Sequence, residues 1–147
     1  MVADDHPLYR QGLVETIGRR PDMDIVGEAD TGTSALQQIR KLKPNVAVID
    51  MKMPGEGGMH VMRQIARDDL PTRVLFLSGY IQGGTVYEAV QAGARGYISK
   101  DRDAEAICEA IAAVAEGQMV LGAEVQEAIA EEIRLRPDEE ASPLSQR

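Results

Sequence analysis

The chain has 147 residues, with 24 acidic and 16 basic side chains and a formal net charge of -8. That length fits one domain with a short appendage, and the charge argues against DNA binding by these residues, because non-specific DNA affinity comes largely from Lys and Arg. No apolar run approaches the roughly 18 residues that cross a bilayer, and Cys108 has no second cysteine as a disulfide partner. The first residues show neither the basic start nor the apolar stretch that is typical of a secretory leader. These features predict a cytoplasmic protein without a membrane contact.

Short apolar runs alternate with amphipathic stretches along the chain. After a first strand ending at Asp4-Asp5, the predicted strands are residues 25–29, 46–50, 74–78 and 96–98. Two of them are continuously apolar over four residues, which is typical of a parallel sheet covered on both faces. Apolar residues spaced by three and four predict helices between the strands. The alternation predicts a doubly wound α/β domain over residues 1–117.

The chain changes character after Gly117. Val125, Ala128, Ile129 and Ile133 predict a further short amphipathic helix, and the charged stretch after it reads as a linker. Residues 118–142 are therefore predicted to be an extension helix and a linker.

Polar residues follow the ends of the predicted strands. Asp4 and Asp5 end the first, Asp50 the third and Ser78 the fourth, and the fifth runs into Lys100. In open α/β sheets ligands bind outside the carboxyl ends of the strands, so we expect these side chains to converge on one rim.

Three aspartates at one rim repel one another unless a cation lies among them. Oxygen ligands favour Mg²⁺ over a soft metal, and an ionised aspartate is also a nucleophile toward phosphorus. We therefore predict that Asp50 accepts a phosphoryl group, with Mg²⁺ on Asp5 and Asp50 and a metal-bound water on Asp4. The Ser78 hydroxyl and the Lys100 ammonium would neutralise charge on the remaining phosphoryl oxygens.

Five short motifs in this order resemble the receiver domain of response regulators of the NarL/FixJ type, over residues 1 to about 120. The motifs are Asp4-Asp5-His6-Pro7, the Val-Ile-Asp-Met-Lys-Met-Pro-Gly run through Asp50, Leu77-Ser78, the Ala-Gly-Ala-Arg-Gly-Tyr run to Tyr97, and Ser99-Lys100-Asp101. The resemblance implies a flavodoxin-like fold whose five parallel strands have the order 2-1-3-4-5. The apolar run before Asp4 is shorter than is usual in this family, which suggests a trimmed chain or a misplaced start.

The resemblance also implies a function and further site residues. It implies Mg²⁺-dependent phosphotransfer from a sensor histidine kinase and slow self-dephosphorylation, with no other enzymatic activity. The backbone carbonyl of Lys52 would bind the metal. Ser78 and Tyr97 would form the switch, with Tyr97 turning inward on activation, and the surface of residues 83–116 would change.

The final residues, 143–147, resemble the opening of a LuxR-type helix-turn-helix domain. This match favours a transcription regulator truncated before its DNA-binding domain over a stand-alone receiver. DNA binding would then depend on the missing domain, and whether the receiver forms a homodimer is left open.

Other interpretations remain for the chain and for single residues. A phosphatase like the haloacid dehalogenases would need an acid where Lys52 stands, and a pseudo-receiver scaffold would not need all five motifs. Simpler roles are a helix cap for Ser78, a solvated charge for Lys100 and core packing for Tyr97. Structural roles are also predicted for three more residues. We expect His6 to orient the loop before Pro7, His60 to lie exposed on a helix, and Cys108 to pack as an inert thiol.

Overall fold

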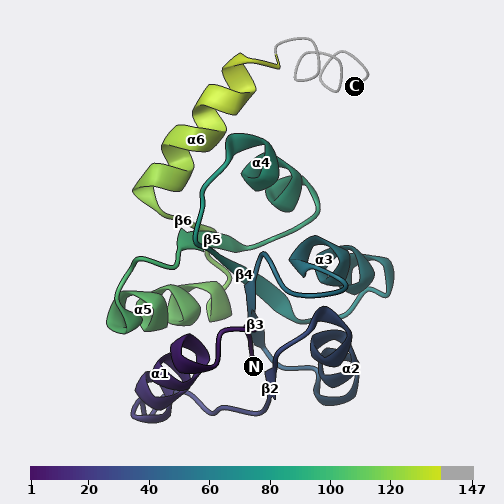
Figure 1. Cartoon of the computed structure of the whole chain (residues 1–147), viewed down its shortest axis with the longest axis vertical. Coiled ribbons are helices and arrows are strands. Elements are labelled where there is room, and N and C mark those ends of the chain that lie inside the picture. The colour runs from purple at the N-terminus through teal and green to yellow at the C-terminus, as the bar shows by residue number, and fades with distance from the viewer. Residues whose placement is uncertain (137–147) are drawn as a thin grey trace.

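The computed structural model describes residues 1–136, and they form a parallel six-stranded sheet with helices on both faces (Figure 1). The strand order is β2-β1-β3-β4-β5-β6. The strands are β1 (Val2–Ala3), β2 (Glu28–Ala29), β3 (Val46–Asp50), β4 (Arg73–Ser78), β5 (Gly96–Ser99) and β6 (Val120–Leu121). The helices are α1 (Pro7–Gly18), α2 (Gly32–Leu42), α3 (Gly58–Arg67), α4 (Gly83–Gln91), α5 (Ala104–Ala115) and α6 (Ala123–Arg134). The predicted α/β class and the order of the first five strands are confirmed.

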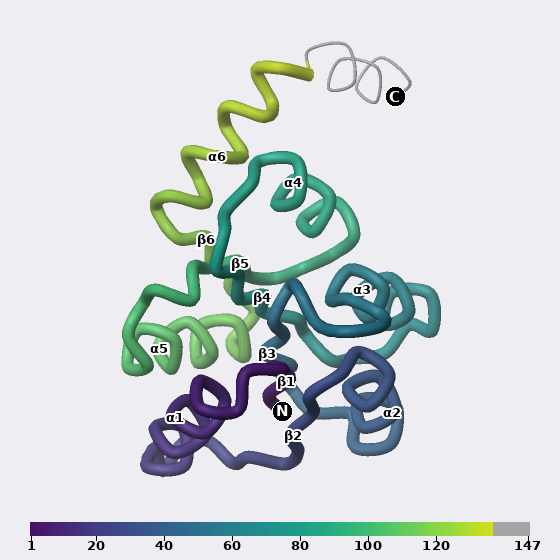
Figure 2. Tube along the Cα trace, viewed as in Figure 1, coloured from purple at the N-terminus to yellow at the C-terminus, as the bar shows by residue number. Residues whose placement is uncertain are grey.

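The sheet separates two apolar cores. Helices α1 and α5 lie on one face, and α2, α3 and α4 lie on the other (Figures 1 and 2). One core joins Leu13 and Ile17 of α1 to Ile107 and Val114 of α5. The other core joins the buried residues of α2, α3 and α4, together with Val125 of α6. Because both faces are covered, β3 is buried along its whole length and β4 at every residue after Arg73.

Local sequence explains where several helices begin. Pro7 opens α1, as expected for a residue whose fixed φ suits the first helical turn. The Thr31 hydroxyl accepts a hydrogen bond from the Ser34 amide at the start of α2. The Asp103 carboxylate accepts one from the Ala106 amide at the start of α5. These caps satisfy amides that have no partner within their own helix.

The sheet differs from the prediction at its two edges. Only Glu28–Ala29 of the expected strand 25–29 pairs with β1, and Val26 is 49% exposed. At the other edge, β6 pairs with β5 in the register Gly96 to Val120 and Tyr97 to Leu121. The sheet therefore has six strands where five were expected.

The predicted extension helix is present as α6, and it packs against α4. Val125 is its fully buried residue, and Ile129 lies partly buried against the same core. Within residues 1–136 no helix is long and apolar enough to span a membrane. The end of the predicted linker and residues 143–147 lie outside the described residues.

Candidate phosphoacceptor site

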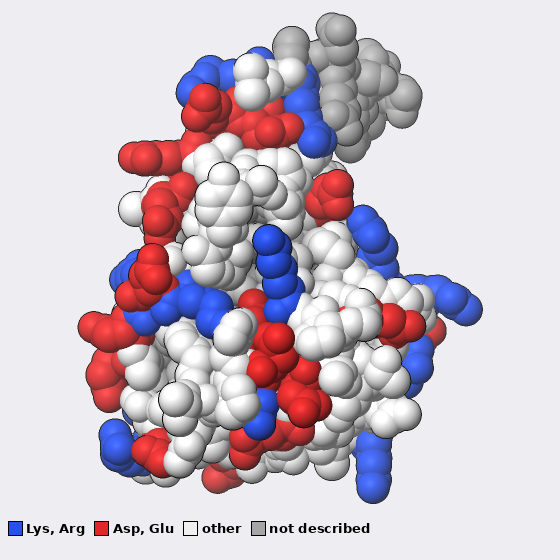
Figure 3. Space-filling view, viewed as in Figure 1, with Lys and Arg blue, Asp and Glu red and all other residues white. Residues whose placement is uncertain are grey.

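The predicted site residues come together at the carboxyl ends of the central strands. β1 runs into Asp4, β3 ends at Asp50, β4 ends at Ser78, and β5 is followed by Lys100. Figure 3 shows acidic side chains gathered near the middle of this face of the molecule, with basic side chains beside them. The parallel register aligns these strand ends, since Ile49 pairs with Phe76 and Ser78 with Ser99.

Asp50 lies at the centre of the group and is only 3% exposed. Its Oδ2 accepts a hydrogen bond from Lys100 Nζ at 3.3 Å, and its Oδ1 accepts one from the Lys52 amide at 3.3 Å. Burial raises the pKa of Asp50 and the charge of Asp4 adds to this, while Lys100 and the Lys52 amide act in the opposite direction. The carboxylate is thus held in a place where its negative charge is only partly compensated.

Asp4 and Asp5 supply two further carboxylates that are incompletely satisfied. The Asp4 side chain is 2% exposed, and its Oδ1 accepts a hydrogen bond from the His6 amide at 2.8 Å. Lys100 Nζ lies 2.8 Å from Asp4 Oδ2 as an ion pair, but this oxygen accepts no hydrogen bond from the described residues, and neither does Asp5 Oδ1. Three carboxylates share the Lys100 ammonium, so their negative charge is only partly offset, and this oxygen donor set fits a hard divalent cation such as Mg²⁺.

Lys100 is fixed by an aromatic residue that the sequence did not single out. Its ammonium lies 4.3 Å from the centre of the Tyr9 ring, and the Tyr9 hydroxyl donates to the Lys100 carbonyl at 3.4 Å. Burial raises the pKa of Tyr9 to about 12, helped by the charges of Asp4, Asp50 and Asp101. Tyr9 therefore remains neutral and orients the cation, as a cation–π contact does.

Ser78 and Tyr97 lie close to the acidic group, but among residues 1–136 the hydrogen bonds of the Ser78 hydroxyl go to Tyr80 and the Tyr97 hydroxyl has no hydrogen-bond partner. The Ser78 hydroxyl donates to the Tyr80 carbonyl at 2.7 Å and accepts from the Tyr80 amide at 3.3 Å. The Tyr97 side chain is fully buried and tilted against Phe76, with ring centres 5.9 Å apart. Burial raises the pKa of Tyr97, and the nearby Ser78 hydroxyl opposes that shift. Ser78 binds the loop after β4, and no helix cap is formed by its side chain.

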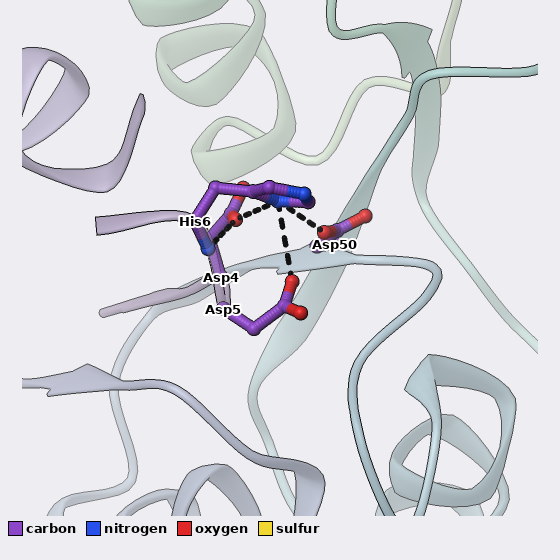
Figure 4. Close-up of side chains that lie close together, drawn as sticks. All are labelled: Asp4, Asp5, His6 and Asp50. Carbon is purple, nitrogen blue, oxygen red and sulfur yellow. Dashed lines mark hydrogen bonds and ion pairs between the residues drawn. The ribbon is translucent and has the colours of Figure 1, made fainter. Parts of the chain in front are cut away.

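His6 turns out to face the site, which its position in a loop did not predict. Figure 4 shows its Nδ1 directed at the carboxylates of Asp4, Asp5 and Asp50, with separations of 2.9, 3.2 and 3.6 Å. The contact with Asp4 agrees with the predicted role of orienting this loop. The position of His6 directly after Asp4 and Asp5 is the sequence feature that could have indicated its closeness to the carboxylates.

A glycine brings the start of α3 close to Asp50. A Cβ on Gly58 would lie 2.8 Å from Phe76 Cε1 and 3.1 Å from the Asp50 carbonyl oxygen. A side chain here would push α3 away from the end of β3. Gly58 is therefore a positioning residue that sequence reasoning missed.

The remaining predicted residues have simple surroundings. Lys52 is exposed and its amide binds Asp50, whereas metal binding by its carbonyl stays a prediction. His60 lies on α3 and pairs with Glu56 at 3.0 Å. Cys108 is fully buried, and burial raises the pKa of its thiol, so it packs as expected.

Comparisons with solved structures place this fold in one class. The receiver domain of a NarL response regulator from Mycobacterium tuberculosis superposes with a TM-score of 0.77 at 40% identity, over 80% of this chain and 94% of that one. A LuxR-family two-component response regulator from Aurantimonas superposes with a TM-score of 0.83 at 33% identity, over 90% of this chain and 94% of that one.

Sequence comparison agrees with the structural one. The family model described as the response regulator receiver domain matches residues 1–112. A transcriptional regulatory protein named NarL from M. tuberculosis is 39% identical over 100% of this chain and 68% of its own length. The nitrate/nitrite response regulator NarP of Escherichia coli is 33% identical over 89% of this chain and 61% of its own length. The chain belongs to the response regulator receiver domain family, and it is homologous to the NarL- and LuxR-type regulators.

Proposed function

We propose that Asp50 accepts a phosphoryl group from the phosphohistidine of a sensor kinase, in a reaction that requires Mg²⁺. The observation that carries this proposal is the buried Asp50 carboxylate, with the Lys100 ammonium 3.3 Å from one oxygen and two more carboxylates beside it. In the reaction, an Asp50 oxygen bonds to phosphorus as the phosphorus–nitrogen bond of the donor breaks. The product is an acyl phosphate, and hydrolysis by water restores the carboxylate.

The residues of the rim divide the charge between them. Asp5, Asp50 and the Lys52 carbonyl would hold Mg²⁺, with Asp4 binding a water of the ion, and the ion would supply positive charge for one phosphoryl oxygen. Lys100 acts as a point charge on another, and Tyr9 keeps it in place. The Ser78 hydroxyl can bind the third only by leaving the Tyr80 carbonyl. Phosphoryl transfer depends on such positioning and charge compensation.

The transfer of Ser78 from Tyr80 to the phosphoryl group would be the first step of a conformational switch. Phosphorylation shifts such an equilibrium only if the phosphoryl group binds one state better than the other. Tyr97 is already buried in this structure. The proposed inward turn would therefore start from a different conformation, in which the Tyr97 ring points outward. We expect the change to reach residues 83–116. This range includes α4, which packs against α6.

The output is proposed to be transcription. We propose that residues 1–117 are the phosphoacceptor domain, 118–142 the extension and linker, and 143–147 the start of a DNA-binding domain. The relative named as a transcriptional regulatory protein extends beyond the part matched here. We propose that the protein is cytoplasmic and contacts DNA only through that further domain. Whether it forms a homodimer is tested by measuring its mass in solution.

The experiment is incubation with Mg²⁺ and acetyl phosphate, followed by intact mass measurement. A single phosphate adduct is expected for the wild type, none for Asp50→Asn, and none when Mg²⁺ is chelated. Asp101→Asn is the matched control, because Asp101 is an exposed aspartate directly after Lys100, and it should form the adduct. Absence of any adduct would instead support a pseudo-receiver, and rapid repeated turnover of acetyl phosphate would support a phosphatase.

A further inference from the structure

Tyr97 is enclosed by the last strand and the last helix of the described chain. It lies on β5, which would be the edge strand of the sheet without β6 (Figure 1). Tyr97 pairs in register with Leu121, and its carbonyl accepts a hydrogen bond from the Gly122 amide at 3.3 Å. Residues paired in register on adjacent strands lie on the same face of a sheet. Leu121 therefore lies beside the Tyr97 ring, on the side where the edge would otherwise be open.

Helix α6 completes this cover by packing against α4. Val125, in the first turn of α6, is fully buried in the same apolar core as Tyr97 and Val86 of α4. An added Cβ on Gly83 would lie 2.5 Å from the Ala128 carbonyl oxygen, so the backbones of the two helices are in close contact. The complete burial of the Tyr97 ring therefore depends on β6 and α6 as well as on α4.

The inward position of Tyr97 is held by packing and not by a hydrogen bond of its hydroxyl. That hydroxyl is buried, and no atom of residues 1–136 forms a hydrogen bond with it. A buried hydroxyl without a partner lowers stability, because it has lost its hydrogen bonds to water. The ring lies tilted against Phe76, with ring centres 5.9 Å apart. Apolar packing, to which α6 contributes, must therefore offset the cost of the hydroxyl.

We propose that β6 and α6, residues 120–134, form a clamp over Tyr97, so that the ring turns outward only when α6 has left α4. Docking of α6 and the inward position of Tyr97 then favour each other by the same factor. The inference rests on the proposed function for the role of Tyr97 as a switch residue, and it adds α6 as the segment that responds. Since phosphorylation is proposed to turn Tyr97 inward, it should tighten α6 on α4.

The first test is hydrogen exchange of the α6 amides, which reports how often α6 opens. Tyr97→Phe removes the unpaired hydroxyl, and α6 exchange should slow about fivefold. Tyr80→Phe is the matched control, because Tyr80 is exposed, and its α6 exchange should equal that of the wild type. The α2 amides should keep their rates in both variants. Unchanged α6 exchange in Tyr97→Phe, or equal slowing of α2 and α6, overturns the proposal.

The second test releases α6 and observes the Tyr97 ring. The chain has four tyrosines, and with fluorotyrosine labelling the fluorine-19 resonance of Tyr97 is the one lost in Tyr97→Phe. Gly83→Ala should move this resonance toward that of a solvent-exposed ring. Gly84→Ala, where the nearest atom would be 3.8 Å from the new Cβ, should not. Val125→Asp is a second variant that should release α6, because it would bury an unpaired charge.

Two results of this test contradict the clamp. One is a Tyr97 resonance that stays at its buried position in a variant whose α6 amides exchange faster. The other is α6 exchange that accelerates in neither Gly83→Ala nor Val125→Asp, because α6 would then not open separately from the core.

The third test links the clamp to phosphorylation. After treatment of the wild type with Mg²⁺ and acetyl phosphate, α6 exchange should slow in samples whose intact mass shows the adduct. Asp50→Asn treated in the same way should show no change. An adduct without slower α6 exchange overturns the link between phosphorylation and α6. Absence of the adduct counts against the proposed function instead, and the first two tests then decide the clamp without it.

Discussion

The acidic rim and the contact between α4 and α6 are built on opposite principles. At the rim, the carboxylates of Asp4 and Asp50 are buried close together, and the burial of Asp50 raises its pKa. At the helix contact, Gly83 lies so close to α6 that an added Cβ would be 2.5 Å from the Ala128 carbonyl oxygen. The buried like charges of the rim lower the free energy of unfolding and are suited to binding a cation. The close packing of α4 against α6 raises the free energy of unfolding. Substitutions should therefore have opposite consequences in the two regions.

The largest expected effect is at Asp50. Asp50→Asn should abolish the phosphate adduct, because the amide cannot act as the nucleophile. It should also raise the free energy of unfolding by about 1 kcal/mol, since it removes a buried charge that Asp4 repels. Thermal unfolding followed by circular dichroism measures this, and a lower melting temperature for Asp50→Asn would contradict the picture of a rim under repulsion.

Mg²⁺ should stabilise the rim and leave the helix contact unaffected. At a hundredfold excess over its dissociation constant a ligand that binds only the folded state adds about 2.7 kcal/mol. We expect a rise in melting temperature on adding Mg²⁺ that is lost in Asp5→Asn. Asp22→Asn is the control, because Asp22 is an exposed carboxylate paired with Arg20 away from the rim. An equal Mg²⁺ effect in both variants would argue against a specific site.

Gly83→Ala tests the helix contact. The new Cβ would meet the Ala128 carbonyl at 2.5 Å and the Glu132 Cβ at 3.0 Å, so α6 must move, at a cost of about 1–3 kcal/mol. Hydrogen exchange of the α6 amides should accelerate, while the phosphate adduct still forms. In Gly84→Ala the nearest atom is 3.8 Å away, and exchange should stay slow. Equal exchange in the two variants would contradict the close fit.

The smallest expected effect concerns Cys108, which lies in the core on the α1 and α5 face. Burial raises the pKa of this thiol, so it remains protonated and unreactive at neutral pH. Labelling by iodoacetamide should be slow in the native protein. In Gly83→Ala the rate of Cys108 labelling should rise far less than the rate of hydrogen exchange of the α6 amides. An equal rise in the two rates would mean that α6 does not open separately from the core.

Much of the fold and of the site could be predicted because both follow from local patterns. The continuous apolar runs in β3 and β4 identified buried parallel strands, and their ends located Asp50 and Ser78. Asp4 and Lys100 followed from the same rule, and the structure brings Asp4, Asp50 and Lys100 into contact.

What could not be predicted depends on contacts between distant segments. β6 has only two residues, both half-buried, and it is a strand only through pairing with β5. The pattern of α6 identified a helix, but nothing in it named α4 as its partner. The direction of the His6 ring and the position of Tyr9 beside Lys100 likewise depend on side-chain torsions in the folded state.

The central claim is that Asp50, and neither of its acidic neighbours, carries the phosphoryl group. Borohydride reduces an aspartyl phosphate to homoserine, and peptide mass spectrometry after Mg²⁺ and acetyl phosphate treatment then locates the modified residue. We predict homoserine at position 50 and unmodified aspartate at Asp4 and Asp5. Homoserine at Asp4 or Asp5, or at no position although the protein takes up phosphate, would contradict this account.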